Sequence, residues 1–177
     1  LGQVTTRVLT VTIRSGVYYV SAASGTDSAT CGPQASPCAS ITHGLARSLA
    51  ESRTQLRVTG GTYARFAAVN GISVAGGYSA DFSTRGNAAD RSYVTPAVGG
   101  STYNAILATG VNRATSISGF TINAGTAPGG TASAAVHVEG SSTSLTLSDM
   151  TITGSTGVHA TGVLISGGSP VPPASST

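Results

Sequence analysis

The chain has 177 residues, of which 40% are hydrophobic and only 8% are charged. This length suits one domain with a real core, so we expect a single domain over 1–168 and a Pro/Ser-rich tail or linker over 169–177. All nine basic residues are arginines scattered singly along the chain, and the net charge is +3. Because the arginines form no cluster, the composition argues against a nucleic-acid-binding surface. No apolar run is long enough to cross a bilayer, so no membrane span is predicted.

Residues 4–20 are predicted to form two strands. Leu9, Val11 and Ile13 alternate with threonines, which is the period-two pattern of a half-buried strand. A Ser-Gly pair interrupts the pattern, and the β-rich run VYYV follows at 17–20.

The only cysteines, Cys31 and Cys38, enclose the Gly/Pro loop CGPQASPC in a turn-rich stretch. A metal or redox site is one interpretation, but the spacing is wider than CxxC and the three histidines are distant in sequence. We therefore predict a disulfide, which implies an oxidising compartment and an extracellular or cell-surface location. Closure of so short a loop stabilises the fold by about 2–3 kcal/mol.

A helix is predicted over about 40–52. Ile41, Leu45 and Leu49 recur every four residues and form a narrow apolar stripe, with His43 on the exposed side. Ser40 is a suitable N-cap because its hydroxyl can accept a hydrogen bond from an amide of the first turn.

Short apolar runs separated by glycine corners follow the helix. The first runs contain Leu56, Val58, Phe66, Ala68, Ile72 and Val74, and the later predicted strands are 104–108, 115–122, 134–138, 144–153 and 157–165. A helix followed by very short strands with glycine corners is typical of the start of a β-solenoid whose first coil the helix covers.

The second half of the chain contains a repeat. TSISGFTINAG (115–125) aligns with SLTLSDMTITG (144–154), so that Ile117 matches Leu145 or Leu147. AAVHVEGSS (134–142) aligns with TGVLISGGS (161–169). Both offsets are slightly under thirty residues, which is the length of one three-strand coil of a parallel β-helix.

The opening block resembles a known family. YYVSAASGTDSATCGPQASPCASITHGLARS is similar to the N-terminal start of bacterial right-handed parallel β-helix repeat proteins, where a YVDAASGSD-type strand leads through a Cys-containing loop into a PCxTIxxALxxA helix. QLRVTGGTYA and GISVAGGYSADFSTR resemble the next two pieces, "VxVAxGTY" and "GG[YF]xxDFxxR". The resemblance covers about residues 17–165. It implies a secreted or surface-bound protein with a β-helix that usually continues for many more coils. Together with the helix and the repeat, we expect an all-β fold here: a right-handed parallel β-helix (solenoid) of a few coils with an N-terminal α-helical cap.

Some relatives of this fold are polysaccharide lyases or hydrolases, and many have no known activity. Such enzymes need paired acids for hydrolysis, or a Ca²⁺ cluster with a basic residue for elimination. The chain has only six acids and no acid-dense cluster, so we predict no catalytic residue, no metal site and no cofactor. If an ion binds, the enzymes on this fold suggest Ca²⁺.

Two groups of residues remain as candidate sites. Asp81, Arg85, Asp90 and Arg91 lie in one irregular loop, which is either a sugar or ion site or a corner held by Asp–Arg pairs.

His137 and Glu139 share one face of a strand, opposite Val136 and Val138, and form a candidate surface patch. His159 lies about one coil later, so a His/His/Glu metal patch is the alternative to solvated side chains.

The last predicted coil is followed only by Gly, Pro and Ser, although a bare last strand presents unpaired amides and carbonyls. The chain is therefore a fragment of a longer solenoid, or its tail folds back, or the open end joins another copy or another surface protein. We predict an extracellular structural, adhesive or self-assembling surface module without catalysis. The alternative is a carbohydrate-binding or carbohydrate-active domain with glycans as partners.

Overall fold

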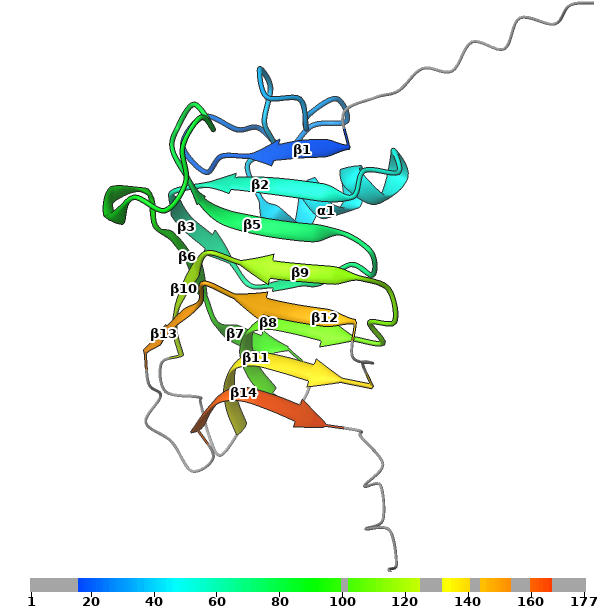
Figure 1. Cartoon of the computed structure of the whole chain (residues 1–177), viewed down its shortest axis with the longest axis vertical. Helices are drawn as coiled ribbons and strands as arrows, with labels where there is room; N and C mark the ends of the chain where they lie inside the picture. The colour runs from blue at the N-terminus through cyan, green and yellow to red at the C-terminus, as the bar shows by residue number, and fades with distance from the viewer. Residues whose placement is uncertain (1–15, 100–101, 125–131, 141–143, 154–159, 167–177) are drawn as a thin grey trace, which may run out of the picture.

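The computed structural model describes residues 16–99, 102–124, 132–140, 144–153 and 160–166. This part of the chain is mostly β, with one α-helix and one 3-10 turn (Figure 1). The strands are β1 Val17–Val20, β2 Gln55–Thr59, β3 Gly61–Ala64, β4 Phe66–Ala67, β5 Ser73–Tyr78, β6 Ser92–Thr95, β7 Ala97–Gly99, β8 Thr102–Thr109, β9 Thr115–Ser118, β10 Phe120–Asn123, β11 Ala132–Glu139, β12 Leu145–Ser148, β13 Thr151–Thr153 and β14 Ala160–Ser166. The helix α1 is Ile41–Ala50, and the 3-10 turn η1 is Ala88–Asp90.

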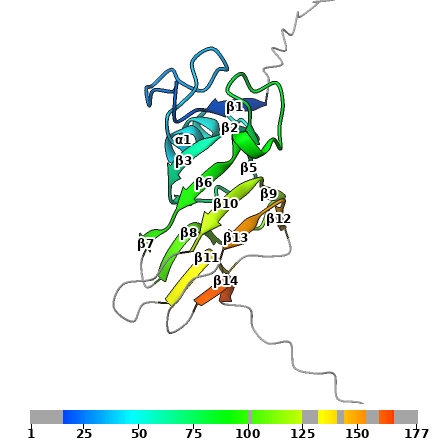
Figure 2. The same ribbon diagram turned by 90° about the vertical axis from the view of Figure 1, so that its left-hand side faces the viewer.

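The strands form three parallel sheets. Sheet A has the order β1-β2-β5-β9-β12, sheet B the order β3-β6-β10-β13, and sheet C the order β4-β8-β11-β14. The exception is β7, which pairs antiparallel with β8. From β2 onward the chain visits sheets A, B and C in turn, so each circuit adds one strand to each sheet (Figure 2).

Successive circuits lie in register. Ile117 pairs with Leu147, a spacing of 30 residues. Of the two residues predicted to match Ile117, Leu145 and Leu147, the second is therefore confirmed. In sheet C, Val136 pairs with Val163 and Val138 with Ile165, a spacing of 27 residues. The predicted repeat therefore corresponds to one circuit through the three sheets.

The inward side chains of all three sheets form one apolar core. Each sheet contributes a ladder of paired residues, and the ladders are Val74–Ile117–Leu147 in sheet A, Tyr63–Val94–Ile122–Ile152 in sheet B and Phe66–Ile106–Val136–Val163 in sheet C. The Phe66 and Phe120 rings pack with their centroids 5.8 Å apart. Full burial of one such side chain stabilises the fold by roughly 1.5–3 kcal/mol, so the ladders supply most of the cohesion between circuits.

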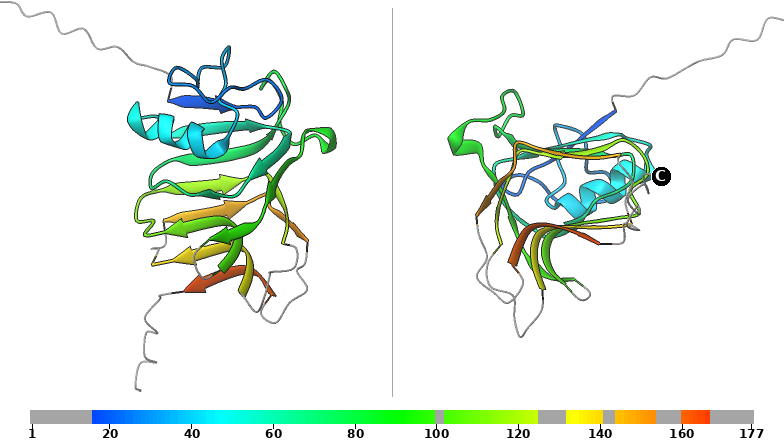
Figure 3. Two further views of the ribbon diagram at one scale, coloured as in Figure 1. Left: turned by 180° about the vertical axis from the view of Figure 1, so that it is seen from behind. Right: turned by 60° about the horizontal axis from the view of Figure 1, so that its bottom comes forward.

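Helix α1 covers the β1 end of this core, and the view from the opposite end shows it lying within the outline of the three sheets (Figure 3). The predicted N-cap is confirmed, because the Ser40 hydroxyl accepts a hydrogen bond from the His43 amide. The predicted apolar stripe is wrong at Leu49, which is 61% exposed. The helix instead turns Gly44 inward, where an added Cβ would lie 2.6 Å from a methyl carbon of Val20. This close approach to β1 sets the rotation of the helix and leaves Leu49 outside.

Two predicted strands are each split by a corner. Residues 115–122 form β9 and β10, and residues 144–153 form β12 and β13, which belong to different sheets. The break is a single residue in the left-handed backbone region, Gly119 (φ +74°) in one circuit and Asp149 (φ +51°) in the next. A corner of one residue leaves the apolar pattern almost continuous, so it looks like one strand. Strands β3, β6 and β7 were not predicted.

The predicted strand at Leu9, Val11 and Ile13, the tail at 169–177 and His159 lie outside the described residues. Among the described helices, none is long and apolar enough to cross a membrane.

Candidate functional site

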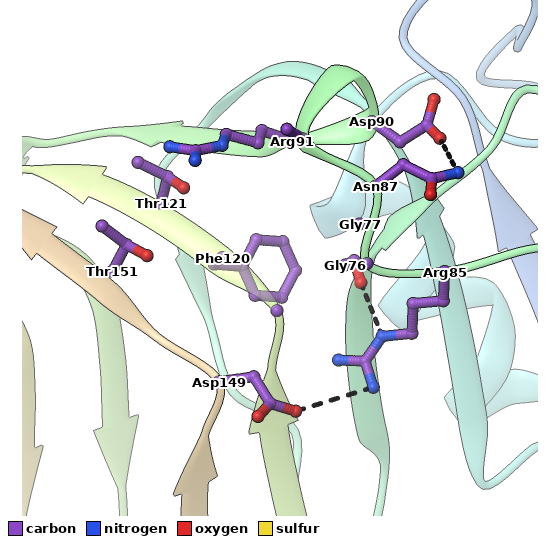
Figure 4. Close-up of a pocket in the computed structure, with 13 residues that line it drawn as sticks. Gly76, Gly77, Arg85, Asn87, Asp90, Arg91, Phe120, Thr121, Asp149 and Thr151 are labelled. Atoms are coloured by element: carbon purple, nitrogen blue, oxygen red, sulfur yellow. Dashed lines mark hydrogen bonds and ion pairs between the residues drawn. The ribbon is translucent and has the colours of Figure 1, made fainter.

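A groove of about 520 Å³ lies between the loop that follows β5 and the outer surface of β10 and β13, and we call it the sheet-B groove (Figure 4). Its lining residues are Gly76, Gly77, Arg85, Gly86, Asn87, Ala88, Asp90, Arg91, Gly119, Phe120, Thr121, Asp149 and Thr151. They come from three successive circuits, so the groove exists only because the circuits stack. Its volume lies within the range usual for ligand pockets.

The floor of the groove is the corner between sheets A and B. Gly77 (φ +80°), Gly119 and Asp149 all adopt the left-handed backbone conformation there. A Cβ on Gly76 would lie 2.8 Å from the Gly119 carbonyl oxygen, so the first two circuits approach too closely for a side chain. The third circuit has Asp149 at the position of Gly119, and aspartate tolerates this backbone conformation better than most residues. The corner therefore places a carboxylate at the lower edge of the groove.

Arg85 fills the space that the glycines leave. Its Nε donates to the Gly76 carbonyl oxygen at 2.8 Å, and its Nη2 donates to the Ser118 hydroxyl at 2.7 Å. Its Nη1 lies 3.9 Å from an Asp149 carboxylate oxygen, and its guanidinium lies over the Tyr78 ring, 5.8 Å from the centroid. The guanidinium is thus fixed in place, and Asp149 offsets part of its charge.

The upper edge of the groove carries polar groups that can form further hydrogen bonds with a ligand. The Asn87 amide donates to an Asp90 carboxylate oxygen at 3.1 Å, which orients that carboxylate and leaves its other oxygen open to a ligand. Arg91 is exposed, and its side chain has no hydrogen bond or ion pair with any described residue. A guanidinium with five unused donors is a strong recognition group for hydroxyl or carboxylate oxygens.

The outer face of sheet B extends the groove into a flat polar surface. Thr62, Tyr93, Thr121 and Thr151 occupy paired positions on β3, β6, β10 and β13. Neighbouring strands lie about 4.8 Å apart, so the row is continuous from Thr151 to Tyr93. Tyr93 is 44% exposed, which is unusual for a large aromatic residue in this chain. Its ring offers an apolar platform beside the hydroxyls of the groove.

The predicted loop site is divided by the structure. Arg85, Asp90 and Arg91 line the sheet-B groove, whereas Asp81 lies outside it, against the disulfide loop. The Asp81 carboxylate accepts hydrogen bonds from the Ser79 hydroxyl at 2.6 Å and from the amide and hydroxyl of Ser83. The Ser79 hydroxyl, followed by these Ser83 donors, lowers the pKa of Asp81 to about 2. Asp81 therefore holds the loop in shape and is not part of the groove.

His137 and Glu139 do not share an exposed patch. Glu139 is exposed, but His137 is only 7% exposed. Val136 and Val138 lie in the inward ladder as predicted, and His137 pairs with Leu107 on the other face of sheet C. The expectation that His137 is a solvated side chain is wrong, because the outer face of β11 is also buried at this position.

The predicted disulfide between Cys31 and Cys38 is confirmed, with 5.0 Å between the Cα atoms. The Asp27 carboxylate and the His43 ring lie within 4.8 Å of the sulfurs, which resembles a metal-ligand set. Both sulfurs are used in the disulfide, and Asp27 accepts hydrogen bonds from the Ala39 and Ser40 amides and the Ser40 hydroxyl. Burial raises the pKa of Asp27, but the donors from Ser40 and Ala39 outweigh this effect and hold the pKa below its ordinary value. This cluster anchors the loop to the helix.

Sequence reasoning missed the groove residues Asn87, Thr121, Asp149 and Thr151. Thr121 and Thr151 are related by the repeat, and Asp149 aligns with Gly119, so the alignment contained a signal. What it lacked was the corner, which decides that these residues face the preceding loop. Comparisons with protein-family models, curated proteins and solved structures found no match to this chain.

Proposed function

We propose that the chain is an extracellular, non-catalytic adhesive module that binds a glycan in the sheet-B groove, built on a right-handed parallel β-helix. The β-helix is supported by the three parallel sheets that the chain visits in turn and by the resemblance of the opening block to bacterial β-helix repeat proteins. The extracellular location is supported by the buried disulfide, because such bonds persist in oxidising compartments.

The observation that carries the proposal is the composition of the groove beside an exposed aromatic ring. Donors (Arg91 and Asn87), acceptors (Asp90 and Asp149) and hydroxyls line one cavity, and Tyr93 lies on the neighbouring strand, paired with the lining residue Thr121. Glycans present vicinal hydroxyls, which are both donors and acceptors, together with apolar C–H faces. A flat groove with both kinds of hydrogen-bonding group and one aromatic platform matches these features.

Binding is favoured by the fixed geometry of the floor. Arg85 is held at three points, so it loses little freedom when a ligand arrives and can present its outer N–H groups without reorganisation. Arg91 is exposed and supplies donors at the rim. We therefore expect modest affinity that depends on Arg91 and Tyr93 more than on any other pair.

The test is a glycan array followed by calorimetry with the selected oligosaccharide. Arg91→Ala and Tyr93→Ala should each weaken binding at least about tenfold, equivalent to about 1.4 kcal/mol. The matched control is Arg113→Ala, which removes the same charge from an exposed arginine outside the groove and should leave binding unchanged.

Two results would overturn the proposal. The first is the absence of any glycan whose binding depends on Arg91 or Tyr93. The second is release of reducing ends or unsaturated products that is lost in Asp90→Asn and Asp149→Asn, since turnover would make the groove an active site.

A further inference from the structure

The corner between β4 and β5 carries the Asn-Gly pair of the chain, Asn70–Gly71. Residues 69–72 form a β-turn there, since the Ile72 amide donates to the Val69 carbonyl oxygen at 3.0 Å. Gly71 has a φ of +82°, the left-handed conformation that the third residue of a type II turn requires. The turn therefore demands glycine after Asn70. This is the sequence in which asparagine deamidates most readily, because glycine leaves the attacking nitrogen unhindered.

Deamidation at such a pair needs only the two residues and water. The Gly71 amide nitrogen loses its proton and attacks Cγ of Asn70, so that a new C–N bond closes a five-membered ring. The bond from Cγ to Nδ2 breaks, and the side-chain nitrogen takes up the proton and leaves as ammonia. Water then opens the cyclic imide at one of its two carbonyls and yields aspartate or isoaspartate. Isoaspartate places an extra methylene in the main chain, so this product would shift the register between β4 and β5.

The next circuit occupies the attacking nitrogen. The Gly71 amide donates to the Thr115 hydroxyl oxygen at 2.8 Å. The single proton of that hydroxyl is donated to the Arg113 carbonyl oxygen at 2.8 Å, so the Thr115 oxygen faces Gly71 as an acceptor. Thr115 is 3% exposed, which shields this hydrogen bond from water. The nitrogen is thus held in its protonated, unreactive form.

The Asn70 side chain is held by the same circuit. Its Oδ1 accepts hydrogen bonds from the Arg113 amide at 2.8 Å and the Asn112 amide at 3.3 Å, and its Nδ2 donates to Asn112 Oδ1 at 2.6 Å. The main chain opposes ring closure as well, because the second residue of a type II turn has a ψ near about +120°. Ring closure brings the Gly71 nitrogen next to Cβ of Asn70, which requires a negative ψ. The turn must therefore open before the reaction can occur.

We propose that Asn70–Gly71 is a latent deamidation site, which the circuit of Thr115 keeps unmodified while the two circuits are stacked and which reacts when this corner opens. The contact between the circuits then sets the rate of the reaction. Each opening of the corner carries a risk of permanent damage to the stack, so the site limits the lifetime of the fold. The proposal does not depend on glycan binding in the sheet-B groove.

The test is the rate of deamidation at Asn70 in the full chain at mildly alkaline pH, followed by mass spectrometry of the proteolytic peptide that contains Asn70. The folded, unaltered chain should react at least about 10-fold more slowly than the same chain unfolded in urea, because opening breaks the turn and the bonds to the next circuit. Thr115→Val keeps the shape of threonine but removes the acceptor, so it should raise the rate in the folded chain at least about threefold. Thr115→Ser keeps the hydroxyl, is the matched control and should react like the unaltered chain.

Two further variants separate this corner from overall stability. Asn112→Ala removes the acceptor of Asn70 Nδ2 at an exposed position and should also accelerate the reaction, with an unchanged circular dichroism spectrum. Ile122→Ala removes a buried side chain of sheet B that contacts none of these groups, and it should leave the rate unchanged.

The proposal is overturned if the folded and the urea-unfolded chains react at the same rate. It is also overturned if Thr115→Val reacts no faster than Thr115→Ser, or if Asn112→Ala reacts no faster than the unaltered chain. Equal acceleration by Ile122→Ala and Thr115→Val would overturn it too, since the protection would then come from overall stability and not from this corner.

Discussion

Substitution of Gly119 by alanine should damage both the fold and the groove. Gly119 has a φ of +74°, and an added Cβ would lie 2.5 Å from the Gly76 carbonyl oxygen and 2.6 Å from Arg85 Nη2. The first neighbour is backbone and cannot move aside easily. The second belongs to the guanidinium that the corner holds, so Gly119→Ala should displace Arg85 from its bonds to Gly76 and Ser118.

The magnitude follows from a matched glycine. Gly110 has a φ of +62°, and an added Cβ there meets nothing within 4 Å, so Gly110→Ala measures the left-handed strain alone, about 1–2 kcal/mol. Gly119→Ala adds the backbone clash and the loss of two charge-assisted hydrogen bonds, which we discount to about 1 kcal/mol each because Arg85 is partly exposed. The strain and the two lost hydrogen bonds alone sum to about 3–4 kcal/mol, so we expect a total of at least this size, at least about 2 kcal/mol more than for Gly110→Ala.

The assay is urea unfolding followed by far-ultraviolet circular dichroism, since the chain has no tryptophan. With a slope near 2 kcal/mol/M, the two variants should differ in midpoint by at least about 1 M. Equal midpoints for Gly119→Ala and Gly110→Ala would refute the close approach of the circuits at this corner.

Three further predictions concern the core, the loop and the disulfide. Ile117→Ala should lower the free energy of unfolding by about 3–4 kcal/mol in the same assay, because it opens a cavity in the sheet A ladder, whereas Ser116→Ala should change it by about 0.5 kcal/mol or less. The lowered pKa of Asp81 stabilises the folded loop above pH 3.8, and this contribution should be lost as the pH falls through about 2. Midpoints measured against pH should therefore fall more steeply below pH 4 in the unaltered chain than in Asp81→Asn. Replacing Cys31 and Cys38 together by alanine should cost about 2–3 kcal/mol, and an unchanged midpoint would contradict the loop-closure argument.

The sequence pattern was sufficient where periodicity alone determines the structure. The helical period, the Ser40 cap, the disulfide and the pairing of β11 with β14 could be predicted because each depends on local spacing or on a direct repeat. The rotation of α1 could not, because it is set by Gly44 against Val20, a contact between residues whose packing the pattern does not encode.

The loop residues of the sheet-B groove could be predicted from the sequence, whereas the residues of its floor could not. Arg85, Asp90 and Arg91 were singled out because they interrupt an apolar pattern, and all three line the groove. Asp81 could not be distinguished from these three residues by sequence, but its carboxylate already accepts hydrogen bonds from the Ser79 and Ser83 hydroxyls. Asp149 was not predicted because a corner of one residue does not interrupt the alternation of apolar and polar residues. This corner places the Asp149 carboxylate near the Arg85 guanidinium.

The most direct measurement of the central claim is a nuclear magnetic resonance titration of the labelled chain with the oligosaccharide that the array selects. We expect the largest amide shifts at Thr121, Asp149 and Thr151, and a shift of the Arg91 Nε–H signal, because these groups face the groove from three circuits. Shifts confined to the outer faces of sheets A and C, with the groove signals unmoved, would contradict the account.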